Sequence, residues 1–280
     1  MNSKILIKLH AYGESIRPFT CILGMAGAYI GGIVADAPFF STPLLLAMVV
    51  VFLVGAGSMP FNDYFDRDVD IIAHPKRPIP SKRLTPKETL YFSIILLSSA
   101  AVIALFINWI SFVIILSTIG FLYSYETLFK NQGFIGNIVV AFLSSMSFTF
   151  GGIAVENPFA SLLLSLITFN LFTGREILKD VEDVKGDLLT RKTLPMKIGE
   201  HKAVLVASIF LLIAVFLSPL PYILNQLGVW YLITIILVDV LALFVIVQNL
   251  KDLRNTSRSV SLTRIAAAIG VIGIILGAIL

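Results

Sequence analysis

The feature of this sequence that most constrains its fold is a series of nine long apolar stretches separated by shorter polar segments. The stretches run roughly over 18–35, 43–61, 90–107, 109–128, 134–155, 158–178, 203–221, 228–249 and 262–280. A helix that crosses a bilayer needs about 20 mostly apolar residues, and each stretch is close to that length. The sequence therefore predicts an all-α integral membrane protein, a bundle of nine transmembrane helices.

The basic residues lie on one side of this map. All 21 Lys and Arg fall in the N-terminal stretch and in 62–89, 129–133, 175–202 and 250–264. With nine spans, these five segments share one side of the membrane. Basic residues accumulate on the cytoplasmic side, so we predict a cytoplasmic N-terminus and a C-terminus outside. One helix more or fewer would place a basic segment on the wrong side.

Composition narrows the class of protein. The chain is 57% hydrophobic and 14% charged, whereas a soluble domain is about 45–50% apolar and about 25% charged. The net charge of +4 fits contact with membrane lipids, and we expect no nucleic acid and no obligate protein partner. The single cysteine, Cys21, excludes an intrachain disulfide.

Two polar loops, 62–89 and 175–202, each hold an acidic cluster. The first contains Asp63, Asp66 and Asp70, and the second contains Asp180, Asp183 and Asp187. The two triplets have the same spacing. This weak internal repeat predicts two pseudo-related halves within a single domain, 1–280.

The spacing of these aspartates indicates a metal. On a helix, residues i, i+3 and i+7 fall within an arc of about 60°, so each triplet forms a stripe of carboxylates at a helix end. Like charges repel, and something must compensate them. Oxygen ligands suit Mg²⁺, which commonly takes one or two carboxylates together with substrate phosphates. The alternative is two solvated acidic loops neutralised by nearby Lys and Arg.

Basic residues accompany both clusters. Arg77 and Lys82 follow the first, and Lys185 and Arg191 accompany the second. A diphosphate bridged by Mg²⁺ also needs fixed cations, for which Arg offers a fork and Lys a point charge. The alternative for each residue is anchoring to anionic lipid.

These motifs resemble a known family. Asn62–Asp70, followed by 74–80 and paired with 179–187, resembles the UbiA-type membrane prenyltransferases. The resemblance covers essentially the whole chain, including the nine-helix layout and Arg17-Pro18 near the start of the first helix. It implies that Asn62 and the aspartates of both clusters bind Mg²⁺ and a prenyl diphosphate, with Arg17 among the substrate-binding residues.

One motif departs from the family. Members often carry a tyrosine with a lysine four residues on, whereas here Tyr125 precedes Lys130 by five. We expect the pair to meet at a frayed helix end and to act with Asn62 and Asp66 in catalysis.

Three further polar residues lie within the apolar stretches. Asn137 and Asn170 either face the substrate cavity or bond between helices. Asp239 lies deep in an apolar stretch, where we expect an interhelical hydrogen bond rather than catalysis.

The resemblance implies a function. We expect Mg²⁺-dependent transfer of a prenyl group from its diphosphate to a lipid-soluble acceptor, at an active site facing the cytoplasm. The second motif resembles members that alkylate a glycerol-phosphate ether lipid, which favours geranylgeranyl transfer to the hydroxyl of geranylgeranylglyceryl phosphate. The alternatives are an aromatic acceptor of a quinone, chlorophyll or haem-type pathway, and a membrane transporter. Transport is disfavoured because the acidic groups crowd one face rather than the midplane.

Overall fold

A computed structural model describes residues 3–130, 132–187 and 193–279, and every regular element in this part of the chain is helical. The α-helices are α1 Ser3–Ser15, α2 Pro18–Val34, α3 Thr42–Phe65, α4 Arg67–Ala73, α5 Pro86–Leu105, α6 Trp109–Ser124, α7 Phe134–Ala154, α8 Pro158–Asp187, α9 Leu194–Ile198, α10 Glu200–Leu217, α11 Leu220–Ile223, α12 Val229–Lys251 and α13 Thr256–Ile279. A π-helical turn, η1 (Tyr125–Phe129), follows α6, and a 3₁₀ turn, η2 (Leu253–Asn255), precedes α13.

The helices confirm the predicted membrane layout. Among the described residues, eight helical segments of 20 to 27 residues are long and apolar enough to cross a bilayer. The bent pair of α1 and α2, which meet at 45°, raises the number to nine if the pair forms one span. The orientation of the termini stays a prediction.

The outer surface of the bundle is apolar. Large hydrophobic side chains are exposed along its length, with Phe40, Phe159 and Phe216 each about four-fifths exposed. Burying such side chains in an apolar environment is worth roughly 1.5–3 kcal/mol each. A surface of this kind is stable only where lipid replaces water.

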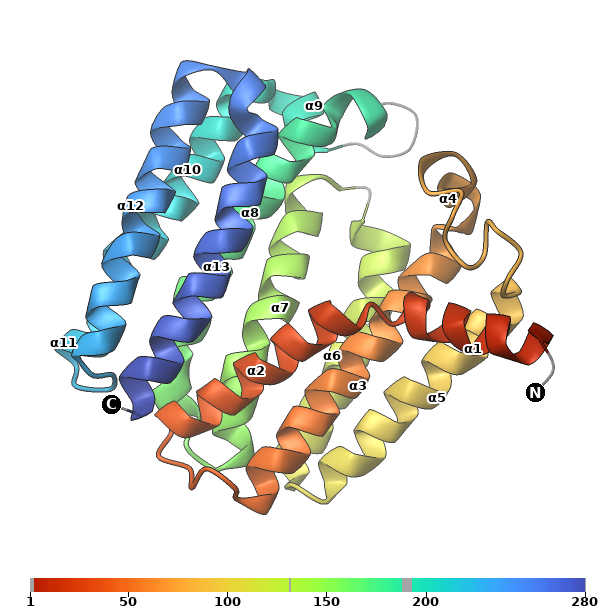
Figure 1. Cartoon of the computed structure of the whole chain (residues 1–280), viewed down its shortest axis with the longest axis horizontal. Coiled ribbons are helices and arrows are strands. Elements are labelled where there is room, and N and C mark those ends of the chain that lie inside the picture. The colour runs from red at the N-terminus through yellow and green to blue at the C-terminus, as the bar shows by residue number, and fades with distance from the viewer. Residues whose placement is uncertain (1–2, 131, 188–192, 280) are drawn as a thin grey trace.

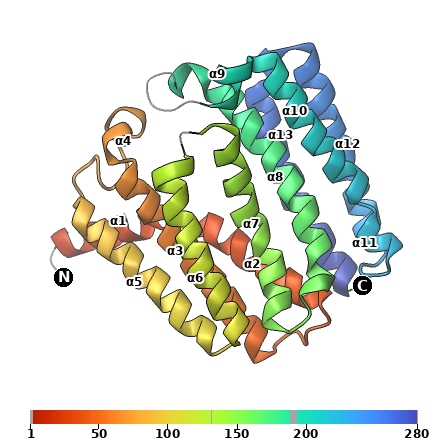
Figure 2. The same ribbon diagram turned by 180° about the vertical axis from the view of Figure 1, so that it is seen from behind.

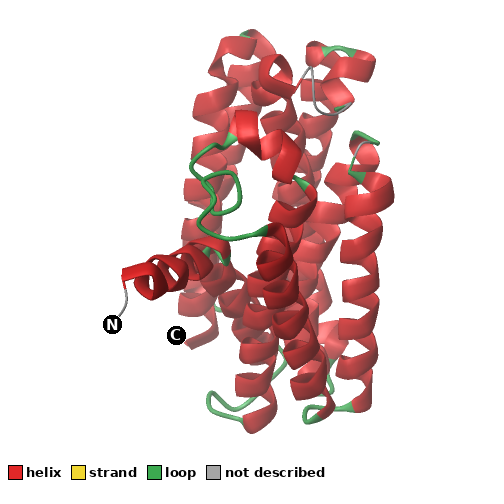
Figure 3. Ribbon diagram, turned by 90° about the vertical axis from the view of Figure 1, so that its right-hand side faces the viewer, coloured by secondary structure: helices red, strands yellow, loops and turns green. Residues whose placement is uncertain are grey.

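Figures 1 and 2 show the long helices running side by side and alternating in direction. As a result, the connections from α3 to α5, α6 to α7, α8 to α10, and α12 to α13 lie at one end of the bundle, at the top of Figure 1. We call this the polar end, because the segments holding both aspartate clusters lie there. Figure 3 shows the N-terminal helix projecting sideways from the bundle.

Small residues bring α2 and α7 into direct backbone contact. A Cβ on Gly31 would lie 1.9 Å from the carbonyl oxygen of Phe148. A Cβ on Gly151 would lie 1.9 Å from the carbonyl oxygen of Ala28. Only glycine allows this approach, which is the way that membrane helices gain packing where no hydrophobic force joins them.

The helices extend further into the predicted loops than the sequence indicated. The loop predicted at 62–89 contains the end of α3, all of α4 and the start of α5. Helix α5 begins at Pro86 because Thr85 and Glu88 form a reciprocal capping box. The loop predicted at 175–202 is largely helical, since α8 continues to Asp187 and α10 begins at Glu200.

Candidate functional site

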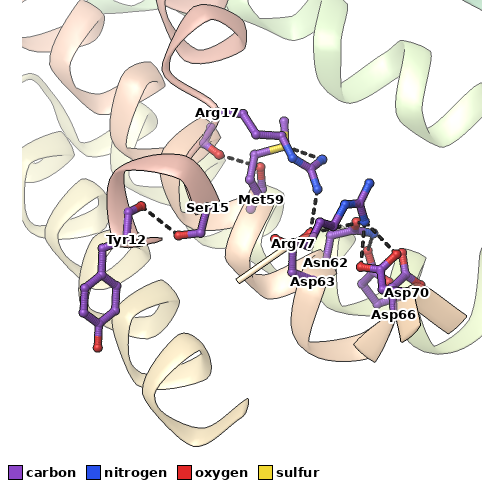
Figure 4. Close-up of polar contacts among 12 residues, drawn as sticks. Tyr12, Ser15, Arg17, Met59, Asn62, Asp63, Asp66, Asp70 and Arg77 are labelled. Carbon is purple, nitrogen blue, oxygen red and sulfur yellow. Dashed lines mark hydrogen bonds and ion pairs between the residues drawn. The ribbon is translucent and has the colours of Figure 1, made fainter. Parts of the chain in front are cut away.

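The first aspartate cluster is held by buried ion pairs at the polar end. Asp63 and Asp70 are 4% and 2% exposed. Arg77 donates from Nη1 to both oxygens of Asp70, at 2.8 and 2.7 Å, and the same nitrogen lies 3.5 Å from Asp63 Oδ1. Figure 4 shows this guanidinium between the two carboxylates. Buried carboxylates need such partners, because an uncompensated buried charge is strongly destabilising.

Arg17 approaches the same cluster from the break between α1 and α2. Its Nη2 donates to Asp63 Oδ1 at 2.5 Å, and its Nη1 lies 3.3 Å from the sulfur of Met59 (Figure 4). Arg17 has left-handed backbone angles, φ 49° and ψ 67°, directly before Pro18. This conformation is uncommon for a residue with a side chain, and it persists only where the surroundings favour it. The break aims the guanidinium at Asp63.

The segment that carries Arg77 is folded on itself between α4 and α5. The Ser81 amide donates to the Arg77 carbonyl oxygen at 3.0 Å. Arg83 donates to the Lys76 carbonyl oxygen at 2.5 Å and to Glu14 of α1 at 2.5 and 3.0 Å. The hydrogen bond to Glu14 raises the pKa of Arg83 further above its ordinary value. These contacts hold Arg77 in place beside the aspartates.

Asp66 does not share the contacts of Asp63 and Asp70. The prediction that the three carboxylates of the first cluster form one continuous stripe is therefore wrong. It lies at the junction where α3 ends and α4 begins, with φ −84° and ψ 0°. Lys130 donates to Asp66 Oδ1 at 2.6 Å and to Glu126 Oε2 at 2.7 Å. Asn62 Nδ2 donates to Glu126 Oε1 at 2.7 Å. The helix break thus turns Asp66 toward η1, whereas Asp63 and Asp70 share Arg77.

A π-helical turn, rather than the frayed helix end that we expected, joins Tyr125 and Lys130. The Lys130 amide donates to the Tyr125 carbonyl oxygen at 2.8 Å, an i→i+5 bond. Lys130 Nζ lies 6.0 Å from the centroid of the Tyr125 ring. The wider turn accommodates the extra residue, so a spacing of five keeps both side chains on one face.

The second cluster lies on the last turns of α8, whose helical backbone continues through Asp187. Asp180 is buried and accepts a hydrogen bond from Asn137 Nδ2 of α7 at 2.9 Å. Asp183 is half-buried one turn later. Helix α8 also includes Asp187 and Lys185, but the side chains of these two lie outside the described structure. Because Asn137 follows η1 closely in sequence, the segment from η1 to α7 links the two clusters.

Other predicted site residues lie elsewhere. Asn170 is buried and donates to the Leu166 carbonyl oxygen of its own helix at 2.8 Å. Lys82 is exposed at a turn with φ 60°. Arg191 lies outside the described residues. Asp239 of α12 accepts from Ser218 Oγ at 2.7 Å, which confirms an interhelical hydrogen bond.

Sequence reasoning missed Glu126. Its side chain is 4% exposed, and it contacts both Asn62 and Lys130. The available signal was an acidic residue at the end of a long apolar stretch, four residues before a lysine. Such a pair also occurs on exposed helices for modest stabilisation, so spacing alone did not mark it.

The oxygen donors of the site match what a divalent cation needs when it also binds phosphate. Within the described part of the chain, no three His, Cys, Asp or Glu side chains are grouped closely enough to hold a metal ion by themselves. Carboxylate oxygens suit hard divalent cations, which in phosphate-binding sites take only one or two carboxylates and complete their shell with phosphate and water. The residues therefore fit a cation shared with a phosphate group.

Comparison with known proteins defines the class. The sequence model of the UbiA prenyltransferase family matches residues 19–277, so the chain belongs to this family. The prediction of a prenyltransferase is confirmed, and the transporter alternative is wrong.

Particular relatives are similar over nearly the whole chain. A digeranylgeranylglyceryl phosphate synthase of Methanococcus maripaludis, strain C7, is 37% identical over 262 residues, covering 91% of this chain and 94% of the relative. A solved structure concerning digeranylgeranylglyceryl phosphate synthase is 37% identical, with a TM-score of 0.83, covering 97% of this chain and 99% of that one. A UbiA homologue from Archaeoglobus fulgidus bound to DMAPP and Mg²⁺ shares the fold, with a TM-score of 0.70 and 17% identity over 95% of this chain and 99% of that one.

Proposed function

We propose that this protein transfers a geranylgeranyl group from geranylgeranyl diphosphate to the free hydroxyl of geranylgeranylglyceryl phosphate. The observation that carries the proposal is the similarity, over nearly the whole chain, to relatives named digeranylgeranylglyceryl phosphate synthase. The buried aspartates and paired cations at the polar end support it. We propose further that residues 1–280 form one domain of two related halves.

The proposed metal is Mg²⁺, because the donors are carboxylate oxygens and an Archaeoglobus fulgidus homologue is solved with DMAPP and Mg²⁺. Its ligands would come from two groups. These are Asp63, Asp66 and Asp70 in the first cluster and Asp180, Asp183 and Asp187 in the second. When bound, Mg²⁺ stabilises the negative charge of the departing diphosphate.

The basic residues of the site would bind the diphosphate directly. Arg17, Arg77 and Lys130 each lie within ion-pair distance of an aspartate of the first cluster. Their cations therefore stand next to the oxygens that would hold the metal. Fixed cations of this kind stabilise charge as it develops on the leaving group and need no reorganisation during the reaction.

The acceptor hydroxyl is a weak nucleophile, so a loose transition state with cation character on the prenyl carbon suits it. The C–O bond to diphosphate breaks as the new ether bond forms, and the hydroxyl proton passes to the diphosphate or a site carboxylate. Tyr125 lies beside Lys130 at the polar end, where its ring could face the prenyl carbon.

We also propose that the polar end faces the cytoplasm. The support is the sequence, in which every Lys and Arg falls in segments on one side of the nine-span map.

A competition assay tests the acceptor. The purified protein in liposomes receives geranylgeranyl diphosphate, Mg²⁺ and equal amounts of geranylgeranylglyceryl phosphate and 4-hydroxybenzoate, and mass spectrometry identifies the product. We expect the ether lipid alone to be alkylated, with no product from an Asp66→Ala variant. Prenylation of the benzoate alone would replace the proposed acceptor with an aromatic one.

A further inference from the structure

Glu126 is a carboxylate at the polar end that no motif assigns. Its side chain is 4% exposed, and its two oxygens accept from different elements. Oε1 accepts from Asn62 of α3 at 2.7 Å, and Oε2 accepts from Lys130 at 2.7 Å. One side chain thus joins the start of the first aspartate motif to the lysine after η1.

The contact with Glu126 determines how the Asn62 amide points. An ionised carboxylate accepts hydrogen bonds and donates none. Asn62 must therefore present its NH₂ group to Glu126, which directs its carbonyl oxygen, Oδ1, to the opposite side. Figure 4 shows Asn62 beside Asp63, Asp66 and Arg77. Only in this orientation does the amide offer an oxygen to a cation held by these aspartates.

The second contact of Glu126 fixes Lys130. The ammonium group lies between Glu126 and Asp66, at 2.7 and 2.6 Å, and its side chain is 13% exposed. Lysine has a long flexible stem, and ordering it costs up to about 2 kcal/mol of side-chain entropy. Two carboxylates at hydrogen-bond distance offset that cost. Glu126 therefore holds the ammonium beside Asp66 before any diphosphate arrives.

We propose that Glu126 is a positioning residue for the diphosphate site. It acts through Asn62, whose Oδ1 it turns toward the cation, and through Lys130, whose ammonium it holds at the first cluster. The inference rests on the proposed function, since it assigns a role within the same site. In this role Glu126 acts through these two side chains rather than as a ligand of the metal or the substrate.

The test is the Glu126→Gln variant of the full chain in liposomes. A glutamine can accept from only one of the two donors, because its NH₂ group must face the other. A hydrogen bond to a charged group is worth about 1.5–3 kcal/mol, so we expect the half-saturating Mg²⁺ concentration and the KM for geranylgeranyl diphosphate to rise roughly tenfold to hundredfold. The kcat should fall as well, because Lys130 also stabilises the charge that develops on the leaving group.

A binding measurement supplies a readout besides activity. Mg²⁺ with geranylgeranyl diphosphate should raise the melting temperature of the wild type, and the rise should be smaller for Glu126→Gln. The matched control is Glu176→Gln, which removes another partly buried carboxylate, paired with Arg175 at 2.5 Å. We expect the control to keep wild-type half-saturation and a wild-type rise in melting temperature.

A double-variant cycle separates positioning from general stabilisation. If Glu126 acts largely through Lys130, adding Glu126→Gln to Lys130→Met should cost much less than it does in the wild-type background. The proposal is overturned by unchanged half-saturation in Glu126→Gln, by an equal change in Glu176→Gln, or by additive effects both in this cycle and in the matching cycle with Asn62→Leu. If Glu126→Gln does not fold, Glu126→Asp is judged by the same criteria. A wild type that makes no product would instead refute the proposed function.

Discussion

Replacement of Arg77 by Met tests whether buried charge compensation holds the first cluster together. Arg77 is the partner of Asp70, which is 2% exposed, and it also lies 3.5 Å from Asp63. Removing one partner of a buried ion pair costs about 3–5 kcal/mol. The Arg77 side chain is 27% exposed, so water screens part of that loss. We expect Arg77→Met to lower the free energy of unfolding by about 2–3 kcal/mol.

The same substitution at two other arginines shows how much of the loss in unfolding free energy is specific to Arg77. In Arg17→Met, Asp63 keeps its neighbour Arg77, so we expect a smaller loss of about 1–2 kcal/mol. Arg67 lies 3.8 Å from the exposed Asp68, donates to the Tyr64 carbonyl oxygen at 2.9 Å and lies 4.9 Å from the centroid of the Tyr64 ring, and Arg67→Met should cost about 1 kcal/mol or less. The assay is thermal or denaturant unfolding of detergent-solubilised protein. Unfolding is followed by the fluorescence of reporter groups that become exposed, or by aggregation.

Binding of the substrate tests the same variants further. If Arg77 also binds the diphosphate, as proposed, Arg77→Met binds Mg²⁺ with geranylgeranyl diphosphate more weakly than the wild type does. A ligand stabilises the folded state more when that state binds it more tightly, so the stability gap between wild type and Arg77→Met should widen in the presence of Mg²⁺ and the diphosphate. Equal stability of Arg77→Met and Arg67→Met, or a gap that does not widen, would refute this account of the cluster.

Two further predictions concern the metal and the membrane orientation. Asp66→Ala and Asp183→Ala should each abolish turnover, and the protein should stay folded because both side chains are only partly buried. Removal of the metal by EDTA should cause the same loss of activity reversibly. Normal turnover in either variant would remove that aspartate from the site. Single cysteines placed in 74–85 and at Lys197, in a Cys21→Ala background, should react with an impermeant maleimide only from the cytoplasmic side, and labelling from outside would reverse the proposed orientation.

The number of helices and the place of the site were predictable because both depend on simple physical patterns. Apolar stretches of membrane length identify spans whatever their packing, and the basic segments fall at one end of them. The equal spacing of the two aspartate triplets marked the residues that the fold gathers at the polar end. Helix ends were less predictable. Helix α8 continues through its charged turns, where Asn137 of α7 bonds to the buried Asp180, and that partner comes from 43 residues away.

The internal geometry of the site depends on tertiary contacts that no local pattern reveals. The Arg17 backbone is left-handed although arginine has no preference for that region. The aspartates of the first triplet point to different partners because the helix breaks at Asp66. Arg77 reaches Asp70 through the fold of the segment after α4 rather than through helical spacing. In each case a contact between distant residues decides the orientation of the side chain.

The spacing of Tyr125 and Lys130 shows how such a contact overrides local geometry. In an α-helix each residue advances about 100°, so residues five apart point in clearly different directions. The π turn closes an i→i+5 bond from Lys130 to Tyr125, which brings the lysine back over the tyrosine ring. A π turn is intrinsically unfavourable, and the ion pairs of Lys130 with Asp66 and Glu126 offset its cost. The inserted residue is therefore tolerated because the site that it serves stabilises the turn that accommodates it.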